Sequence, residues 1–168
     1  MMNVQQPFAS ACLGENCSER LCQKMKRELG FFSFLSEADL EEVSQYFNCR
    51  MVKSGDNVWT SGETSDFVAF IVSGQVQIKV NTEFPGKQVV VGVFSRGAAI
   101  GVNCTVVEEP RNSTARAMDD TGLILITQKN FGRLIDEHPR IGVKLLQGML
   151  LSETTRLHKA YARLASIF

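Results

Sequence analysis

The stretch Ile100-Gly-Val-Asn-Cys-Thr-Val-Val-Glu-Glu-Pro-Arg-Asn-Ser-Thr-Ala-Arg-Ala117 combines the residues that an anion-binding loop needs. Gly101 lets a ligand approach the backbone closely, and a short helix that opens there would aim free backbone N–H groups at an anion. Arg111 supplies a permanent cation whose planar fork can hold a phosphate oxygen by charge-assisted hydrogen bonds. Ser113 and Thr114 add hydroxyls nearby. The stretch therefore predicts a phosphate-binding loop.

Short strands surround this loop on both sides. Runs rich in Val, Ile, Phe and Thr, separated by glycines, predict strands at Arg50–Lys53, Val58–Thr60, Phe67–Val72, Val76–Val80, Gln88–Phe94, Ser113–Met118 and Leu123–Thr127. Seven short strands with turns between them indicate a β-sandwich or β-barrel. The segment Asn81–Gly86 predicts a hairpin turn in which Gly86 adopts a positive φ.

Helices flank the predicted strands. Apolar residues at helical spacing predict a short amphipathic helix over 18–29, and Ser36, followed by an acid three positions on, predicts the start of another. After the strands, a helix begins near Asn130 and stops before Pro139. Pro139 suits the first turn of a last helix of more than about twenty residues, because nothing breaks the pattern from there to the C-terminus.

The last predicted helix carries a stripe with alternating spacings of four and three residues. Its members are Leu150, Thr154, Leu157, Tyr161, Leu164 and Phe168. This spacing is typical of a helix that pairs with another helix. We therefore expect a homodimer through the C-terminal helix. The alternative is that these side chains cover the strands of their own subunit.

Composition and charge limit the function classes. With 168 residues, 44% of them hydrophobic, the chain can build one domain with a sizeable core. Eighteen basic and eighteen acidic residues give zero formal charge, so no overall field would draw the chain to nucleic acid or to a membrane. Neither a signal peptide nor a long apolar run is evident, which predicts a cytoplasmic protein with five reduced cysteines. Cys49 and Cys104 are expected in the core.

The loop also resembles the phosphate-binding cassette of cyclic-nucleotide-binding domains. That cassette reads Phe-Gly-Glu, a short helical turn, then Pro-Arg and small residues, and the spacing from Gly101 through Pro110 to Arg111 matches it without a gap. Outside the loop, the glycine turns at 55–62 and 71–76 and the single Gly97 match as well.

The resemblance extends over roughly residues 30–165 and implies a fold and a domain organisation. The fold is mostly β: a double-stranded β-roll (jelly roll) with N-terminal helices and a long C-terminal helix. Residues 1–29 form an N-terminal arm and short helix, and 30–168 form the cyclic-nucleotide-binding-type domain.

The implied function is a non-enzymatic regulatory sensor that binds cAMP, cGMP or a related phosphate ligand, uses no cofactor or metal, and signals to an unknown downstream protein. The predicted ligand-binding residues are Gly101, Val102, Asn103, Cys104, Arg111, Asn112, Ser113, Thr114, Thr155 and Arg156. In the family the C-terminal helix closes over the base, so Thr155 or Arg156 would read the base edge.

The sequence departs from the family at one position of the cassette. The family's glutamate after the glycine accepts a hydrogen bond from the ribose 2′-hydroxyl, and Val102 stands in its place. Losing this bond costs about 1–3 kcal/mol, or roughly tenfold to a hundredfold in affinity. Asn103 offers a carbonyl oxygen, whereas Glu108 and Glu109 would repel an anion. Two interpretations stay open: a pocket retuned for another phosphate ligand, or a vestigial site in a dimeric protein-interaction scaffold.

Two further classes fit the sequence less well. The family's transcription factors continue into a helix-turn-helix domain, whereas this chain ends at Phe168, so we expect no DNA-binding domain in it. A metal-dependent enzyme of the cupin type needs histidines that project from strands, but His138 and His158 fall on predicted helices.

A redox sensor is the remaining alternative. Cys12, Cys17 and Cys22 have four residues between each neighbouring pair, which loosely resembles the N-terminal iron–sulfur cluster of oxygen-sensing relatives of the catabolite activator. Cys49 or Cys104 would have to serve as the fourth ligand.

Overall fold

The structure is a computed structural model that describes residues 34–107 and 109–166. The predicted helix over 18–29 and the three cysteines Cys12, Cys17 and Cys22 lie outside the described residues.

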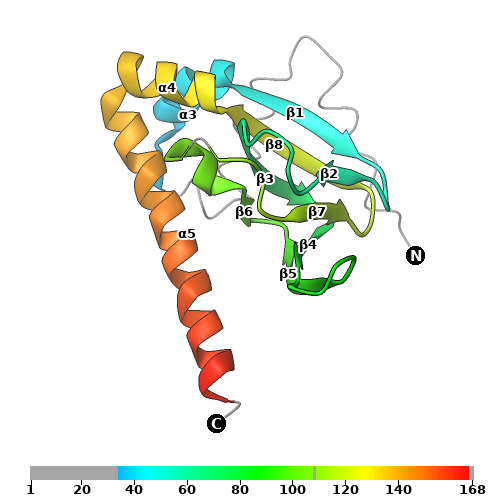
Figure 1. Cartoon of the computed structure of the whole chain (residues 1–168). Helices are drawn as coiled ribbons and strands as arrows, with labels where there is room; N and C mark the ends of the chain where they lie inside the picture. Colours follow the sequence, from blue (N-terminus) through cyan, green and yellow to red (C-terminus); the bar gives the residue numbers. More distant parts are fainter. Residues whose placement is uncertain (1–33, 108, 167–168) are drawn as a thin grey trace, which may run out of the picture.

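Two four-stranded antiparallel sheets form the body of the molecule, with strand orders β1-β8-β3-β6 and β2-β7-β4-β5 (Figure 1). The strands are β1 (Phe47–Val52), β2 (Asn57–Trp59), β3 (Phe67–Ser73), β4 (Gln75–Asn81), β5 (Gln88–Ser95), β6 (Ala99–Ile100), β7 (Thr114–Ala117) and β8 (Thr121–Thr127). This arrangement confirms the predicted jelly-roll architecture and each of the predicted strands, with shifted ends.

The strand pattern differs from the prediction at β1 and β6. β1 begins at Phe47 rather than Arg50, because its pairing with β8 continues to Phe47 opposite Ile126. β6 was not predicted, since a strand of two residues shows no periodicity. Ala99 and Ile100 pair with Phe70 and Ala69 of β3, respectively. This pairing fixes the chain directly before Gly101.

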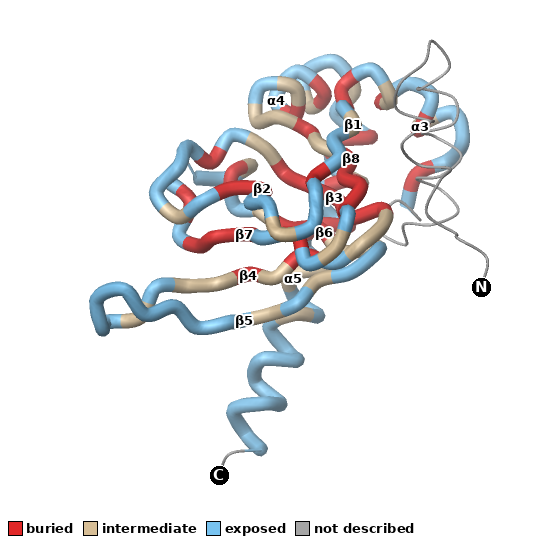
Figure 2. The backbone as a smooth tube through the Cα atoms, turned by 90° about the vertical axis from the view of Figure 1, so that its right-hand side faces the viewer, coloured by how far each residue is buried: buried red, intermediate tan, exposed pale blue. Residues whose placement is uncertain are grey.

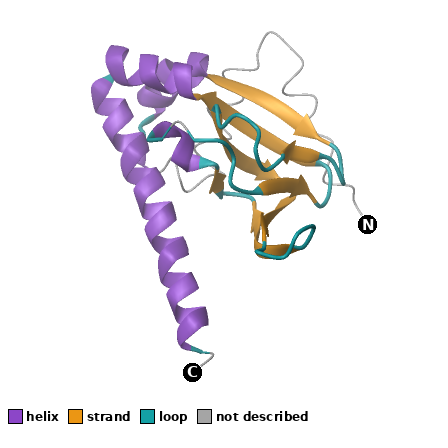
Figure 3. Ribbon diagram, viewed as in Figure 1, coloured by secondary structure: helices purple, strands orange, loops and turns teal. Residues whose placement is uncertain are grey.

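The helices gather at one end and along one side of the roll (Figures 1 and 3). They are α3 (Glu37–Val43), the 3₁₀ helices η2 (Ser44–Tyr46) and η3 (Val102–Thr105), α4 (Gln128–Glu137) and α5 (Pro139–Ala165). The predicted start of α3 is confirmed, because Ser36 Oγ accepts from Asp39 N–H at 3.2 Å and Asp39 Oδ2 accepts from Ser36 N–H at 2.8 Å. Pro139 opens α5, which runs for 27 residues.

The core consists of two apolar clusters. One lies where α3, α4 and the start of α5 meet the first sheet, and it includes Leu40, Phe70 and Leu134. Cys104 is fully buried in this cluster, which confirms its predicted place in the core, whereas Cys49 is only partly buried and packs against the cluster. The second cluster lies in the roll itself and includes residues from both sheets.

Two segments project from this core and keep apolar side chains exposed (Figure 2). β5 is one of the two edge strands of its sheet, and Val89, Val90, Val91 and Val93 are each about half exposed. The hairpin before β5 has the predicted turn, with Gly86 at a φ of 75°. In α5, every described residue from Leu157 onward is exposed. None of the described helices is long and apolar enough to cross a membrane.

Candidate functional site

The predicted anion-binding loop begins at a left-handed glycine. Gly101 has a φ of 74° and caps the short helix η3, so the backbone turns sharply between β6 and η3. A Cβ at this position would overlap Nη1 of Arg111 and lie 3.3 Å from both the Phe67 carbonyl oxygen and the Trp59 ring. The absent side chain of Gly101 therefore leaves room for the guanidinium of Arg111.

Arg111 lies inside the protein, at 3% exposure. Its backbone is fixed by two hydrogen bonds with the neighbouring turn: Arg111 N–H donates to Glu63 O at 2.8 Å, and Gly62 N–H donates to Arg111 O at 2.7 Å. Its guanidinium carbon lies 4.2 Å from the ring centre of Trp59 and 4.7 Å from that of Phe67. The two aromatic side chains hold the guanidinium in one orientation by cation–π contact.

The guanidinium of Arg111 has unused hydrogen-bonding capacity. Its Nη2 donates to Phe67 O at 2.6 Å, but Nε and Nη1 are buried and have no hydrogen-bond partner in the described part of the chain. Burial lowers the pKa of Arg111, and nearby Asp66 and Glu63 only partly oppose this effect. A buried cation with free donors is costly unless an anion pairs with it.

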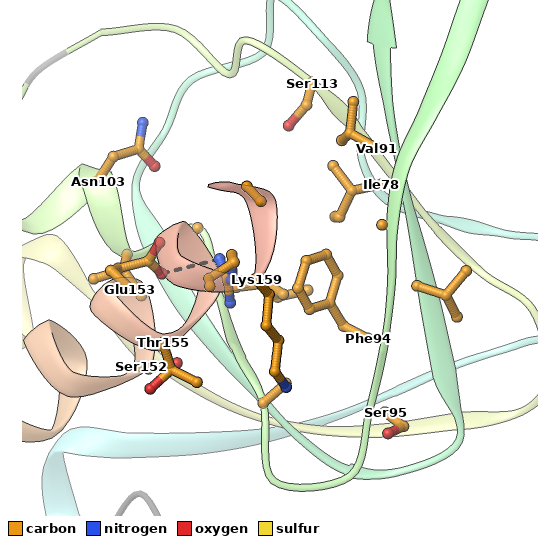
Figure 4. Close-up of a pocket in the computed structure, with 18 of the residues that line it drawn as sticks. Ile78, Val91, Phe94, Ser95, Asn103, Ser113, Ser152, Glu153, Thr155 and Lys159 are labelled. Atoms are coloured by element: carbon orange, nitrogen blue, oxygen red, sulfur yellow. Dashed lines mark ion pairs between the residues drawn. The ribbon is translucent and has the colours of Figure 1, made fainter. Parts of the chain in front are cut away.

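Arg111 lines a cavity of about 910 Å³ that is bounded by three elements of the fold (Figure 4). The loop contributes residues 101–103 and 111–113. The sheet contributes apolar side chains, among them Ile78, Val91 and Phe94. α5 forms the remaining wall. The cavity therefore offers a cationic end, an apolar surface and a helical wall.

Arg156 connects the helical wall to the loop. Its Nη2 donates to the carbonyl oxygen of Ala99, two residues before Gly101, and its guanidinium carbon lies 4.4 Å from the ring centre of Phe94. Its Nη1 lies 2.9 Å from Glu153 Oε1, the ion pair shown by the dashed line in Figure 4. Burial lowers the pKa of Arg156, and Glu153 counteracts part of that shift. α5 is thus fastened to the strand that precedes the loop.

The structure brings most of the predicted site residues to one cavity. Its walls include Gly101, Val102, Asn103, Arg111, Asn112, Ser113, Thr155 and Arg156. Thr155 is exposed, and its hydroxyl donates to the Leu151 carbonyl oxygen at 2.8 Å. That hydroxyl keeps its acceptor capacity for a ligand.

The other two predicted residues do not line the cavity. Cys104 points into the core, where burial raises the pKa of its thiol to about 11. Thr114 is buried in β7, and its hydroxyl oxygen accepts from Ser61 N–H at 3.1 Å. Both belong to the loop stretch in sequence, but η3 and β7 turn their side chains away from the cavity. The structure therefore places these two side chains outside the cavity that the other predicted residues line.

Sequence reasoning missed the aromatic residues that hold Arg111 and Arg156. Trp59, Phe67 and Phe94 come from three different strands, and Trp59 and Phe67 are far from the loop in sequence. The indole N–H of Trp59 is buried and has no partner among the described residues. The residue type alone could have pointed to Trp59, because a buried Trp usually has a polar contact for its indole N–H.

The loop has Val102, and no acid, at the position of the family's ribose-binding glutamate. Val102 lines the cavity and is half-buried, with its side chain packed against the apolar cluster under the helices. Glu153 on α5 supplies the one carboxylate among the described residues that line the cavity, and it is paired with Arg156.

Comparison with known proteins gives the same family from sequence and from fold. The family model described as cyclic nucleotide-binding domain matches residues 49–138. A candidate potassium channel protein from Rhodopseudomonas palustris is 26% identical over 123 residues, which are 73% of this chain and 29% of that relative. The chain thus spans less than a third of that protein.

Solved structures share the fold at low sequence identity. A cyclic nucleotide-binding domain from Methylobacillus flagellatus superposes with a TM-score of 0.81 at 18% identity, covering 90% of this chain and 86% of that one. The regulatory domain of Toxoplasma gondii PKA, in a co-crystal with cAMP, gives a TM-score of 0.67 at 18% identity over 81% of this chain and 50% of that one. The chain belongs to the cyclic nucleotide-binding domain family.

Proposed function

We propose that this chain is a regulatory sensor whose cavity holds the phosphate of a cyclic nucleotide, or of a related ligand, against Arg111. The observation that carries the proposal is the buried guanidinium, whose Nε and Nη1 have no hydrogen-bond partner among residues 34–107 and 109–166. A phosphate offers several acceptor oxygens and a negative charge, so it would satisfy both groups and offset the cost of burying the cation.

The surroundings of Arg111 support a phosphate over a protein carboxylate as its partner. Gly101 lets Nη1 lie directly against the backbone, and the short helix η3 opens at that glycine. The first N–H groups of a helical turn carry partial positive charge, which adds to the attraction for an anion. The hydroxyl-bearing Ser113 lines the same part of the cavity.

The base and the ribose would lie on the remaining surfaces. Ile78, Val91 and Phe94 offer an apolar wall for a base, and Thr155 on α5 offers a hydroxyl to its edge. Val102 provides no acceptor for a ribose 2′-hydroxyl. We therefore propose weak binding of cAMP or cGMP relative to family members that carry the glutamate, or preference for a different phosphate ligand.

The signal would leave the cavity through α5. Arg156 donates to Ala99 O and contacts Phe94, so a ligand that shifts the loop or the apolar wall changes what holds the helix. The distal part of α5 exposes Leu157, Tyr161 and Leu164 at 48%, 58% and 57%. These side chains do not cover their own subunit, which supports the proposal that they face a second copy of the chain.

Thermal-shift titration tests the proposal directly, because a ligand that binds only the folded state raises its stability by mass action. We expect cAMP, cGMP or a cyclic dinucleotide to raise the melting temperature at millimolar concentration. Arg111→Gln should abolish the shift, whereas Arg140→Gln, an exposed arginine at the start of α5, should retain it. Circular dichroism without ligand confirms that both variants fold.

The opposite result favours the scaffold interpretation. If none of these ligands changes the melting temperature of the wild-type chain, the sensor proposal fails. The exposed apolar stripe on α5 would then be the feature that remains to be explained, as the contact surface of a protein-interaction scaffold.

A further inference from the structure

The cavity is lined by an excess of positive charge, whereas the whole chain has no net charge. The chain carries 18 basic and 18 acidic residues. Among the described residues, those with a charge that line the cavity are Arg96, Arg111, Arg156, Lys159 and Arg163, against the single acid Glu153. This local excess of positive charge is larger than one phosphate monoanion would neutralise.

Three of these cations form one face of α5. Arg156, Lys159 and Arg163 are spaced three and four residues apart, so their side chains share the face that lines the cavity. The first and the last are seven positions apart, which is about 10 Å along the helix. Figure 4 shows Lys159 among the residues that line the cavity.

Of the three, Arg156 is partly neutralised and the other two are not. Glu153 pairs with Arg156 at 2.9 Å. Lys159 and Arg163 are exposed, and neither forms an ion pair with another described residue. They belong to α5, whereas Arg111 sits on the loop and is held by Trp59 and Phe67. The cavity therefore has two separate groups of available positive charge.

From this arrangement we infer that the ligand is a nucleotide with at least two phosphate groups, one bound at Arg111 and another at Lys159 and Arg163. The inference rests on the proposed function, because it assigns the first phosphate to the same arginine. The apolar wall of Ile78, Val91 and Phe94 provides surface for a base. A volume of about 910 Å³ lies near the upper end of the range of about 300–1,000 Å³ usual for small-molecule sites.

Two kinds of nucleotide carry this chemistry, and matched ligands separate them. A cyclic dinucleotide has two phosphates apart from each other, and a nucleoside diphosphate has two that are adjacent. Isothermal titration calorimetry would compare cAMP, cyclic di-AMP and ADP, and then cGMP, cyclic di-GMP and GDP, at one fixed ionic strength. Each series keeps the base constant and changes the number and placement of phosphates.

We expect a two-phosphate ligand to bind at least about tenfold more tightly than the single-phosphate ligand with the same base, as an added charge-assisted contact provides. In the double variant Lys159→Gln/Arg163→Gln, this ratio of affinities should fall about tenfold. The double variant Lys129→Gln/Arg140→Gln removes the same charge from exposed positions that do not line the cavity, and it should keep the ratio.

Two results would overturn the inference. In the first, none of the two-phosphate ligands binds more tightly than cAMP or cGMP. In the second, the tighter binding survives in Lys159→Gln/Arg163→Gln. Either result leaves the proposed function standing as long as cAMP or cGMP binds and Arg111→Gln abolishes that binding. If no ligand of either series binds, the proposed function fails together with the inference.

Discussion

At the scale of single residues, Gly101 is required by both the backbone and the site. Its φ of 74° is strained for any other residue, and a Cβ would overlap Nη1 of Arg111. Gly86 separates the two effects, because it has a φ of 75° and a Cβ there would meet no other atom within 4 Å. Substitutions at Gly101 and at Gly86 therefore separate the cost of strain in the turn from the cost of crowding Arg111.

Gly101→Ala should therefore destabilise the protein more than Gly86→Ala does. The strain of a left-handed alanine costs about 1–2 kcal/mol at either position. Crowding against Arg111, Phe67 and Trp59 adds about 1–3 kcal/mol at position 101 alone. Urea unfolding of the two variants measures the difference. Equal losses of stability in the two variants would show that the Arg111 side chain moves aside at no cost in free energy of unfolding.

Val102 sets the affinity for a ribose. Val102→Glu places an acceptor where the family has one, and we expect cAMP to bind about tenfold to a hundredfold more tightly. The gain should be absent for 2′-deoxy-cAMP, which lacks the hydroxyl, and absent in Val102→Met, which has similar length without an acceptor. Calorimetric titration measures all three. No gain in Val102→Glu would indicate a pocket remodelled beyond this one contact.

At the scale of secondary-structure elements, local sequence patterns predicted the features that depend only on residues adjacent in sequence. The cap at Ser36, the positive φ of Gly86 and the opening of α5 at Pro139 each follow from a few adjacent side chains. β6 was not predicted because a strand of two residues shows no periodicity. Its pairing with β3 nevertheless fixes where the loop begins.

The site was predicted only as far as the loop's own sequence extends. Gly101 and Arg111 were found from their spacing. The contacts that orient Arg111 come from Trp59 and Phe67, which tertiary packing brings to it over more than 40 positions of sequence. Cys104 was assigned to the ligand from its position in the loop, but the direction of its side chain depends on the turn of η3. Such long-range and directional features are not encoded in local periodicity.

The contact between α3 and α5 predicts a dependence of stability on pH. Lys144 Nζ lies 2.6 Å from Asp39 Oδ2, and hydrogen bonds from Lys144 and from Ser36 N–H lower the pKa of Asp39 from 3.8 to about 2. Because the folded pKa is lowered, the contact stabilises the fold above about pH 4 and this contribution disappears as the pH falls from 4 to 2.

The variant Asp39→Asn should remove this part of the pH dependence. Urea midpoints measured between pH 2 and pH 5 should fall less steeply for Asp39→Asn than for the wild type. Asp136→Asn makes the same change on an exposed position of α4 and should retain the wild-type slope. An unchanged slope in Asp39→Asn would mean that other carboxylates account for the acid sensitivity of this domain.

At the scale of the whole molecule, α5 presents two different faces. Arg156, Lys159 and Arg163 line the cavity. On a helix of 3.6 residues per turn, the stripe through Leu157, Tyr161 and Leu164 lies largely on the other side. A change in how the cavity holds Arg156 would therefore reposition the exposed stripe. In this proposal one rigid helix carries both the ligand contact and the contact with a second chain.

The proposed dimer gives the last prediction. Leu157 and Leu164 are spaced seven residues apart and expose 48% and 57% of their surface, so a partner helix would bury both in one seam. Leu157→Glu/Leu164→Glu places like charges in that seam, and sedimentation equilibrium should then report a monomer where the wild type is a dimer. Ala162→Glu adds a charge outside the stripe and should leave the dimer intact. A wild-type chain that stays monomeric at about 100 μM would contradict the seam, and α5 would then have to signal through a different protein.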